Sequence, residues 1–187
     1  MEKSEIRKLG KQGRNSIKGQ QRLDFERSIC EKIRKSELYK EATNILSYQA
    51  FGGEVSLELL NQWAVEDGKK LAYPYCTDKT TMIALVPRDE NSYGEDLYGI
   101  KVPMPEKSDL MEPEDVELVL TPLVAFDENC NRTGMGAGVY DRYLPKCENA
   151  QFIGIAFEAQ KMPEIPTEEH DMILKAVVSE KDIYSRE

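Results

Sequence analysis

The sequence has no long apolar run. In its 187 residues, no stretch approaches the roughly 18 consecutive apolar residues that a membrane-spanning helix needs. The first twenty residues are charged and lack the apolar core of a secretory signal. We therefore expect a cytoplasmic protein that does not bind a membrane.

Cysteine is scarce and scattered. The four cysteines, Cys30, Cys76, Cys130 and Cys147, form no C-x-x-C pair. Their spacing fits neither a zinc site nor a small disulfide-linked scaffold, because both need closely grouped cysteines. We expect all four to be reduced thiols, as is usual in a cytosol.

Positively charged residues are fewer than negatively charged ones over most of the chain. The net charge is −9, yet residues 1–18 hold six lysines and arginines against two glutamates, a local +4 that leaves −13 for the rest. An acidic body repels nucleic acid and anionic membranes. We expect no nucleic-acid partner, while the basic N-terminal corner could meet a compact polyanion such as a nucleoside triphosphate.

Internal repeats and long linkers are also absent, and 187 residues fit one domain. Residues 1–187 are therefore expected to form a single unit. Strand-like runs alternate with helical patterns, which predicts an α/β fold with a sheet covered by helices on both faces.

The hydrophobic periodicity predicts the individual elements. A helix opens the chain and a second spans residues 23–33. A third follows Ser56 as its N-cap, and a fourth begins near Val139. The strands are expected at residues 44–48, 70–73 (ended by Pro74), 81–86, 116–126, 152–157 and 176–179. Residues 89–115 are acidic and proline-punctuated, so they are expected to be mostly loop.

Residues 121–144 carry the most chemical information. A buried strand leads into a polar turn, then to glycines at 134, 136 and 138, then directly into a helix. Glycines let backbone N–H groups approach an oxyanion, and a helix N-terminus adds positive potential there. Arg132 could add a bidentate phosphate contact, and Asp141 could hold Mg²⁺ between phosphates.

The glycine pattern alone is a weak signal, because G-x-G-x-G is more often a tight structural turn. Arg132 before it and the run 140–143 after it favour phosphate binding. A dinucleotide-binding oxidoreductase is the second interpretation, with Glu158 as the acid that binds ribose. Against it, the polar stretch 127–133 separates strand from glycines, and the third glycine comes one residue early.

These residues resemble the signature of the 5-formyltetrahydrofolate cyclo-ligases, also called methenyltetrahydrofolate synthetases. The pattern F-D-x-x-x-x-R-x-G-x-G-x-G-x-Y-D-x-Y-L runs from Phe126 to Leu144. The family's other landmarks follow in order along nearly the whole chain: Lys3 and Arg7, Glu54, Pro74, Ile153 to Gln160, and Ile165 to Asp171.

The resemblance implies a three-layer, Rossmann-like fold similar to the NagB/RpiA/CoA-transferase group. It also implies an Mg²⁺- and ATP-dependent ligase of one-carbon metabolism. In the implied reaction, ATP phosphorylates the formyl oxygen of 5-formyltetrahydrofolate, and N10 closes the ring to give 5,10-methenyltetrahydrofolate, ADP and phosphate.

The resemblance also assigns residues to roles. Arg132 and Tyr140 would be catalytic, and Asp141 and Asp171 would hold Mg²⁺. The ATP-binding set would be Lys3, Arg7, Arg132, Thr133, Gly134, Met135, Gly136, Ala137, Gly138, Val139 and Tyr140. The substrate-binding set would be Phe51, Glu54, Tyr98, Met135, Gly136, Ala137, Gly138 and Val139.

Some positions depart from the usual family pattern. Val139 replaces an aromatic residue, and Lys175 replaces an aspartate, which would change the charge near the metal. The other departures are Val102, Met135 and Ala137. A non-catalytic or regulatory nucleotide-binding relative therefore stays open as an alternative. The single histidine, His170, is expected either to support a site residue or to lie at the surface, without a role as a base, and a monomer is expected.

Overall fold

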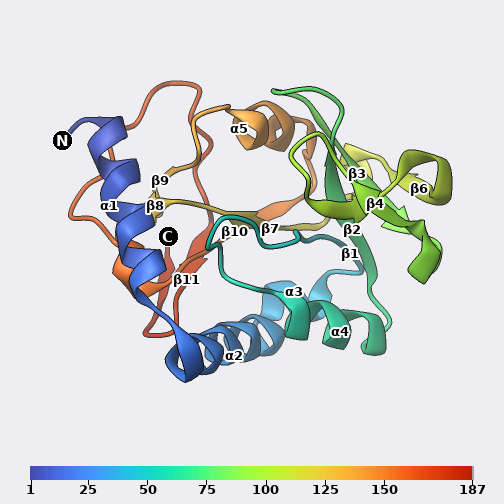
Figure 1. Ribbon diagram of the computed structural model, residues 1–187, viewed down its shortest axis with the longest axis horizontal. Helices are drawn as coiled ribbons and strands as arrows, with labels where there is room; N and C mark the ends of the chain where they lie inside the picture. The colour runs from blue at the N-terminus through green and yellow to red at the C-terminus, as the bar shows by residue number, and fades with distance from the viewer. Residues whose placement is uncertain (187) are drawn as a thin grey trace.

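A computed structural model of the chain describes residues 1–186, in which one eight-stranded sheet lies between helices. Helices α2, α3 and α4 cover one face, α5 covers part of the other, and α1 packs beside the sheet (Figure 1). The helices are α1 (Lys3–Ser16), α2 (Gly19–Lys35), α3 (Glu37–Glu41), α4 (Glu58–Glu66) and α5 (Val139–Tyr143). The strands are β1 (Asn44–Leu46), β2 (Lys70–Cys76), β3 (Met82–Pro87), β4 (Tyr93–Glu95), β5 (Lys101–Pro103), β6 (Ser108–Met111), β7 (Leu118–Pro122), β8 (Ala125–Phe126), β9 (Arg132–Thr133), β10 (Gln151–Ile155), β11 (Ala176–Val178) and β12 (Ile183–Ser185).

The large sheet has the order β12-β11-β10-β7-β1-β2-β3-β6. Its centre, from β11 to β2, is parallel, and antiparallel strands finish both sides. The mixed α/β fold expected from the sequence is confirmed. From β1 the chain adds β2, β3 and β6 on one side of the sheet, and it later returns to add β7, β10, β11 and β12 on the other side of β1. The strand order therefore reverses between β1 and β7.

The central strands are apolar throughout because both faces of the sheet are covered. Along β1, Ile45 packs with the core under α2 and α4, while its neighbour Leu46 packs on the opposite side with α5. In β7, Val119 packs in the same core as Leu46, while Leu118 and Leu120 pack in the same core as Ile45. The alternation of side chains along a strand therefore divides one hydrophobic run between two cores.

Helix α1 packs backbone-to-backbone against the segment after β7 and the turn after β10. A Cβ on Gly10 would lie 2.3 Å from the carbonyl oxygen of Val124, and one on Gly13 would lie 2.1 Å from that of Ala159. Only glycine permits this approach. It brings Lys3 and Arg7, on one face of α1, to the end of the sheet where the chain leaves β7.

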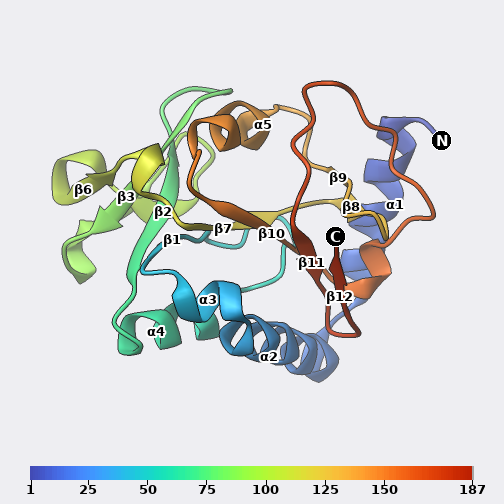
Figure 2. The ribbon, with the colours of Figure 1, turned by 180° about the vertical axis from the view of Figure 1, so that it is seen from behind.

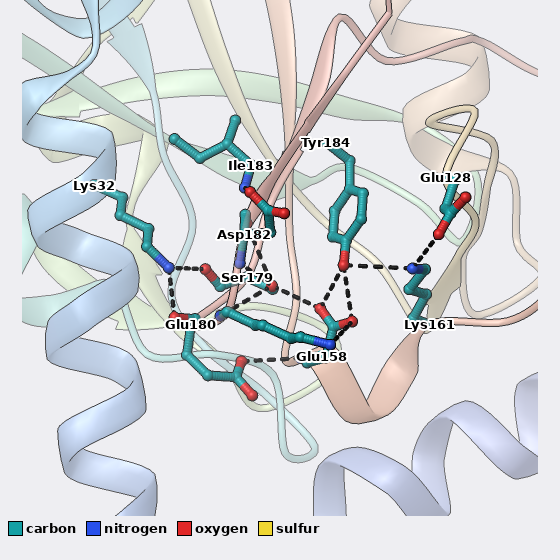
Figure 3. A network of polar contacts seen from close by, with 10 residues as sticks. Lys32, Glu128, Glu158, Lys161, Ser179, Glu180, Asp182, Ile183 and Tyr184 are labelled. Carbon is teal, nitrogen blue, oxygen red and sulfur yellow. Dashed lines mark hydrogen bonds and ion pairs between the residues drawn. The ribbon is translucent and has the colours of Figure 1, made fainter.

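The C-terminal strand β12 closes the far edge of the sheet (Figure 2). A polar network fixes it there (Figure 3): the hydroxyls of Tyr184 and Ser179 donate to Glu158, at 2.8 Å and 2.9 Å. Lys32 of α2 donates to the carbonyls of Ser179 and Glu180, which ties the helix layer to the same turn.

Several predictions about the elements differ from the structure. Pro74 does not end β2, because β1 stops opposite Ala72 and β2 continues beside β3 alone, where a missing N–H is tolerated. The region expected to be mostly loop contains β4, β5, β6 and short 3₁₀ turns. Leu57, not Ser56, is the N-cap of α4. The strand expected at 116–126 is two strands, β7 and β8, on different sheets.

Within residues 1–186, no helix is both long and apolar enough to cross a bilayer.

Candidate active site

A cavity of about 590 Å³ opens at the carboxyl ends of β1, β2 and β7. It therefore lies where the strand order reverses, which is where open α/β sheets bind ligands. Its volume is typical of a small-molecule site. Every residue that the resemblance assigned to a site lines this one cavity, including Lys3 near the N-terminus and Asp171 near the C-terminus.

The glycine-rich loop 134–138 forms one wall. Gly136 and Gly138 have φ values of +109° and +69°, which side-chain-bearing residues rarely adopt. Arg7 donates to the carbonyl of Gly134 at 2.9 Å and supports the loop from α1. Within residues 1–186, no backbone N–H of residues 134–138 donates a hydrogen bond to a protein atom. The loop therefore presents unpaired donors suited to an anion.

Helix α5 contributes less than expected to this anion site. It has only five residues, and Gly138 is its N-cap. A macrodipole sums aligned peptide units, so a helix of little more than one turn supplies little of the potential that the sequence suggested. The positive potential comes instead from side chains.

Arg132 is the most buried of these cations, with 4% of its side chain exposed. The hairpin β8–β9 returns the chain from β7 to the cavity and places Arg132 in its wall. Its guanidinium donates to Asp141 at 2.6 Å, while its buried Nε has no partner among residues 1–186. The hydroxyl of Tyr140, also buried, has none either. Unpaired buried donors in a cavity wall are expected to bind a ligand.

Lys3 is another cation that lines the cavity. It donates to Asp171 at 2.9 Å and lies 3.3 Å from Glu168. Although burial works to lower the pKa of Lys3, its contacts with these two carboxylates raise it above the ordinary value. Burial works to raise the pKa of Asp171, but the Lys3 contact and the Glu168 N–H lower it overall. Both groups are therefore charged near neutral pH.

Glu54 and Phe51 lie at another part of the cavity, on the turn that follows β1. The Glu54 carboxylate accepts from the Phe51 N–H at 3.0 Å. Burial raises the pKa of Glu54 to about 7, and the Phe51 N–H and the charge of Arg14 oppose that rise. Burial also raises the pKa of Tyr140, so its hydroxyl remains a donor. Tyr98, on the β4–β5 hairpin, is 43% exposed at the mouth.

The sequence did not reveal the apolar part of the wall. Side chains from five separate segments meet there: Tyr48, Pro74, Cys76, Met82, Ile100 and Leu123. Val102, noted as a departure from the family pattern, is buried beside them. No local pattern marks these residues, because strand pairing alone brings them together.

Two other expectations can be compared with the structure. Lys175 is not near the proposed metal: its ammonium donates to the carbonyl of Arg186, outside the cavity, so the expected effect on the metal was wrong. His170 lies at the cavity rim with 72% of its side chain exposed, 3.1 Å from Glu168. That position agrees with the expectation of a surface residue.

The carboxylates suit Mg²⁺ in their chemistry, since this ion prefers oxygen ligands and keeps several for water or phosphate. Asp141 uses only Oδ1 for Arg132 and the Met172 N–H, so Oδ2 makes no hydrogen bond within residues 1–186. Asp171 contributes to a group with Glu168 and His170 whose candidate ligand atoms lie within 4.8 Å of one another. The donor set is therefore compatible with a hydrated Mg²⁺ held partly by phosphate.

The dinucleotide interpretation is not supported by this geometry. Its ribose-binding acid would be Glu158, which instead binds Tyr184 and Ser179 in the network that fixes β12 and does not line the cavity. The sequence model of the 5-formyltetrahydrofolate cyclo-ligase family matches residues 1–180. The chain belongs to this family.

Curated relatives of the family align along most of the chain. The 5-formyltetrahydrofolate cyclo-ligase of Haemophilus influenzae is 31% identical over 176 residues, covering 92% of this chain and 92% of that protein. The cyclo-ligase of Escherichia coli K12 is 28% identical over 149 residues, covering 76% and 81%.

Solved structures agree with this assignment. The 5,10-methenyltetrahydrofolate synthetase of Aquifex aeolicus superposes with a TM-score of 0.87 at 25% identity, covering 99% of this chain and 93% of that one. The synthetase from Mycoplasma pneumoniae has a TM-score of 0.79 at 22% identity, covering 96% and 99%, and shares the fold.

Proposed function

We propose that the chain converts 5-formyltetrahydrofolate and ATP to 5,10-methenyltetrahydrofolate, ADP and phosphate. The observation that carries the proposal is the loop 134–138, which lines a cavity together with Arg132, Arg7 and Lys3 and whose N–H groups have no hydrogen-bond partner within residues 1–186. These donors suit a triphosphate, and the apolar wall and Glu54 suit the ring system of a reduced folate.

In the proposed reaction, the formyl oxygen attacks the γ-phosphorus of ATP, and ADP leaves. N10 then attacks the formyl carbon, the C–O bond breaks, and phosphate leaves with that oxygen while N10 releases its proton. A formyl oxygen is a poor leaving group until it is phosphorylated. Phosphoryl transfer depends mainly on positioning and charge stabilisation, which the cations and amides of this cavity can provide.

The residues have distinct proposed tasks. Arg132 and Tyr140 donate to the oxygens that gain charge, and the loop amides with Lys3 and Arg7 bind the phosphates. Bound Mg²⁺, held by Asp141 and Asp171, would neutralise charge on the phosphate oxygens. Lys3 would then exchange part of its contact with Asp171 for phosphate. Glu54 accepts hydrogen bonds from the pterin, and Phe51 and Tyr98 contact the folate at the mouth.

One assay tests the proposal. Purified protein is incubated with 5-formyltetrahydrofolate and Mg-ATP, and the absorbance of the methenyl product is followed. Product that forms only with ATP is expected. ATP binding without product would favour a non-catalytic nucleotide-binding relative, and preferential NAD binding would favour an oxidoreductase. The monomeric state, the single-domain organisation, the cytoplasmic location and the likeness to the NagB/RpiA group stay predictions.

A further inference from the structure

Arg14, at the end of α1, is a buried guanidinium without a carboxylate partner. Only 2% of the residue is exposed. It donates to the carbonyl of Gly52 at 2.7 Å and, more weakly, to that of Leu123 at 3.5 Å. Its Nε is buried and has no partner within residues 1–186. Burying a charge without a hydrogen-bonded counterion is unfavourable, so this position calls for a functional explanation.

The two carbonyls that Arg14 contacts belong to opposite sides of the crevice. Gly52 lies in the turn 51–54 after β1, and Leu123 follows β7. The turn is tight, since Gly52 and Gly53 have φ values of +59° and +88°. Two of its side chains, Phe51 and Glu54, line the cavity. Arg14 therefore bridges the two strand ends between which the substrate is proposed to bind.

A second arginine holds the same turn in a different way. Arg22 of α2 donates to the carbonyls of Gly53 and Glu54 at 2.8 Å and 2.9 Å. Unlike Arg14, it forms an ion pair, with Glu26 at 3.1 Å. Both arginines fix the backbone of the turn, but only the charge of Arg14 lacks a direct counterion.

Few charged or titratable groups act on the Glu54 carboxylate. Arg14 from α1, Tyr48 after β1 and Tyr140 from α5 interact with it through space, and Arg22 of α2 reaches only its backbone carbonyl. Burial raises the pKa of both tyrosines, so they stay neutral. Arg14 is thus the cation that opposes the effect of burial on Glu54.

We propose that Arg14 is a positioning residue for the pterin end of the reduced folate. Its guanidinium fixes the 51–54 turn against the end of β7 and supplies the positive charge that faces the Glu54 carboxylate. The inference rests on the proposed function, and it adds a residue that touches neither substrate. It separates two tasks in one turn: both arginines hold the backbone of the turn, and Arg14 alone also opposes the rise that burial causes in the pKa of Glu54.

The test compares Arg14→Gln with Arg22→Gln, because each glutamine can still donate to a turn carbonyl but carries no charge. The pH dependence of kcat/KM for 5-formyltetrahydrofolate reports ionisations of the free enzyme. We expect Arg14→Gln to raise the folate KM about tenfold and to change the ATP KM less than about twofold. The acidic limb of the kcat/KM profile should move to higher pH by roughly half a pH unit or more. Arg22→Gln should raise the folate KM without moving the limb.

A second readout does not depend on turnover. The carboxyl carbon of Glu54, isotopically labelled, is titrated by NMR in the protein without substrates. We expect its midpoint to rise in Arg14→Gln and to stay at the wild-type pH in Arg22→Gln. Equal midpoints in the two variants would overturn the inference. Wild-type protein without turnover would refute the proposed function instead, whatever the titration shows.

Arg14→Lys covers the case in which Arg14→Gln does not fold. Lysine keeps the charge but cannot span two carbonyls as a planar guanidinium does. We expect the titration of Glu54 to be unchanged and the folate KM to rise. A wild-type folate KM in Arg14→Lys, or a shifted Glu54 midpoint, would contradict the proposal.

Discussion

At the scale of single residues, the contact between Arg132 and Asp141 links the proposed phosphate-binding and metal-binding parts of the site. The sequence placed both residues there but assigned them separate ligands. In the structure they form an ion pair at 2.6 Å, which is largely buried on the arginine side. The pair orients both side chains before substrates arrive, since the buried guanidinium is held by its acceptor.

Replacing Asp141 by Asn keeps the size of the side chain but removes its charge. We expect kcat to fall at least about a hundredfold, because the carboxylate proposed to bind Mg²⁺ is lost. The activity should recover only partly as the Mg²⁺ concentration rises. Steady-state kinetics against Mg²⁺ concentration measures both effects.

Asp67→Asn is the matched control. Asp67 also accepts from an arginine, Arg34, at 2.7 Å, but does not line the cavity. This variant should keep wild-type kcat. Unchanged turnover in Asp141→Asn would remove Asp141 from the mechanism.

At the scale of elements, α1 carries three arginine and lysine side chains to the cavity or beneath it. Lys3 and Arg7 reach the phosphate end, and Arg14 supports the turn after β1. They can do so because Gly10 and Gly13 let the helix backbone touch two other segments of main chain. The glycines of α1 therefore determine the placement of its cations.

Gly10→Ala and Gly13→Ala test that placement. Alanine is the better helix former by about 1 kcal/mol, so helix propensity alone would stabilise both variants. We expect the opposite, a loss of about 1–3 kcal/mol in the free energy of unfolding, because each methyl meets a backbone carbonyl. The KM for ATP should also rise, since α1 must move outward. Chemical denaturation and kinetics measure the two effects.

Gln12→Ala provides the comparison on the same helix. Gln12 is exposed, so its replacement should leave stability and the ATP KM close to those of the wild type. Stabilisation by Gly10→Ala would show that the close packing of α1 is not maintained in solution.

At the scale of the whole molecule, the site couples the stability of the fold to pH through Glu54. Its pKa is about 4.5 when unfolded and about 7 when folded. Between these values the folded state holds a proton that the unfolded state has lost. The protonated carboxyl thus contributes stability that is fully present below pH 4.5 and is lost as the pH rises through 7.

We expect Glu54→Gln to remove that part of the pH dependence. The difference in unfolding free energy between wild type and variant should change by up to about 3 kcal/mol from pH 4.5 to 8, with the wild type relatively less stable at the higher pH. Denaturation at several pH values measures it. Glu148→Gln, at an exposed position, should show no such change. A Glu54→Gln profile parallel to the wild type would contradict the raised pKa.

Local patterns predicted much of the architecture. The alternation of strands and helices indicated the α/β fold. The run from Phe126 to Leu144 indicated the site, because a tight turn and a phosphate-binding loop both depend on consecutive residues. Boundaries were predicted less well. The end of β2 depends on where β1 stops beside it, and the strands within 89–115 depend on partners elsewhere in the chain, as with β3 for β6.

The sequence by itself determined the α/β class, the glycine loop and the family to which the chain belongs, because each is carried by short runs of consecutive residues. Only the tertiary structure decided the apolar wall, the pairing of Asp141 with Arg132 and the burial of Arg14 against two strand ends. The physical reason is that the order of strands in the sheet, which no local pattern specifies, brings distant segments to the point where β1 and β7 diverge.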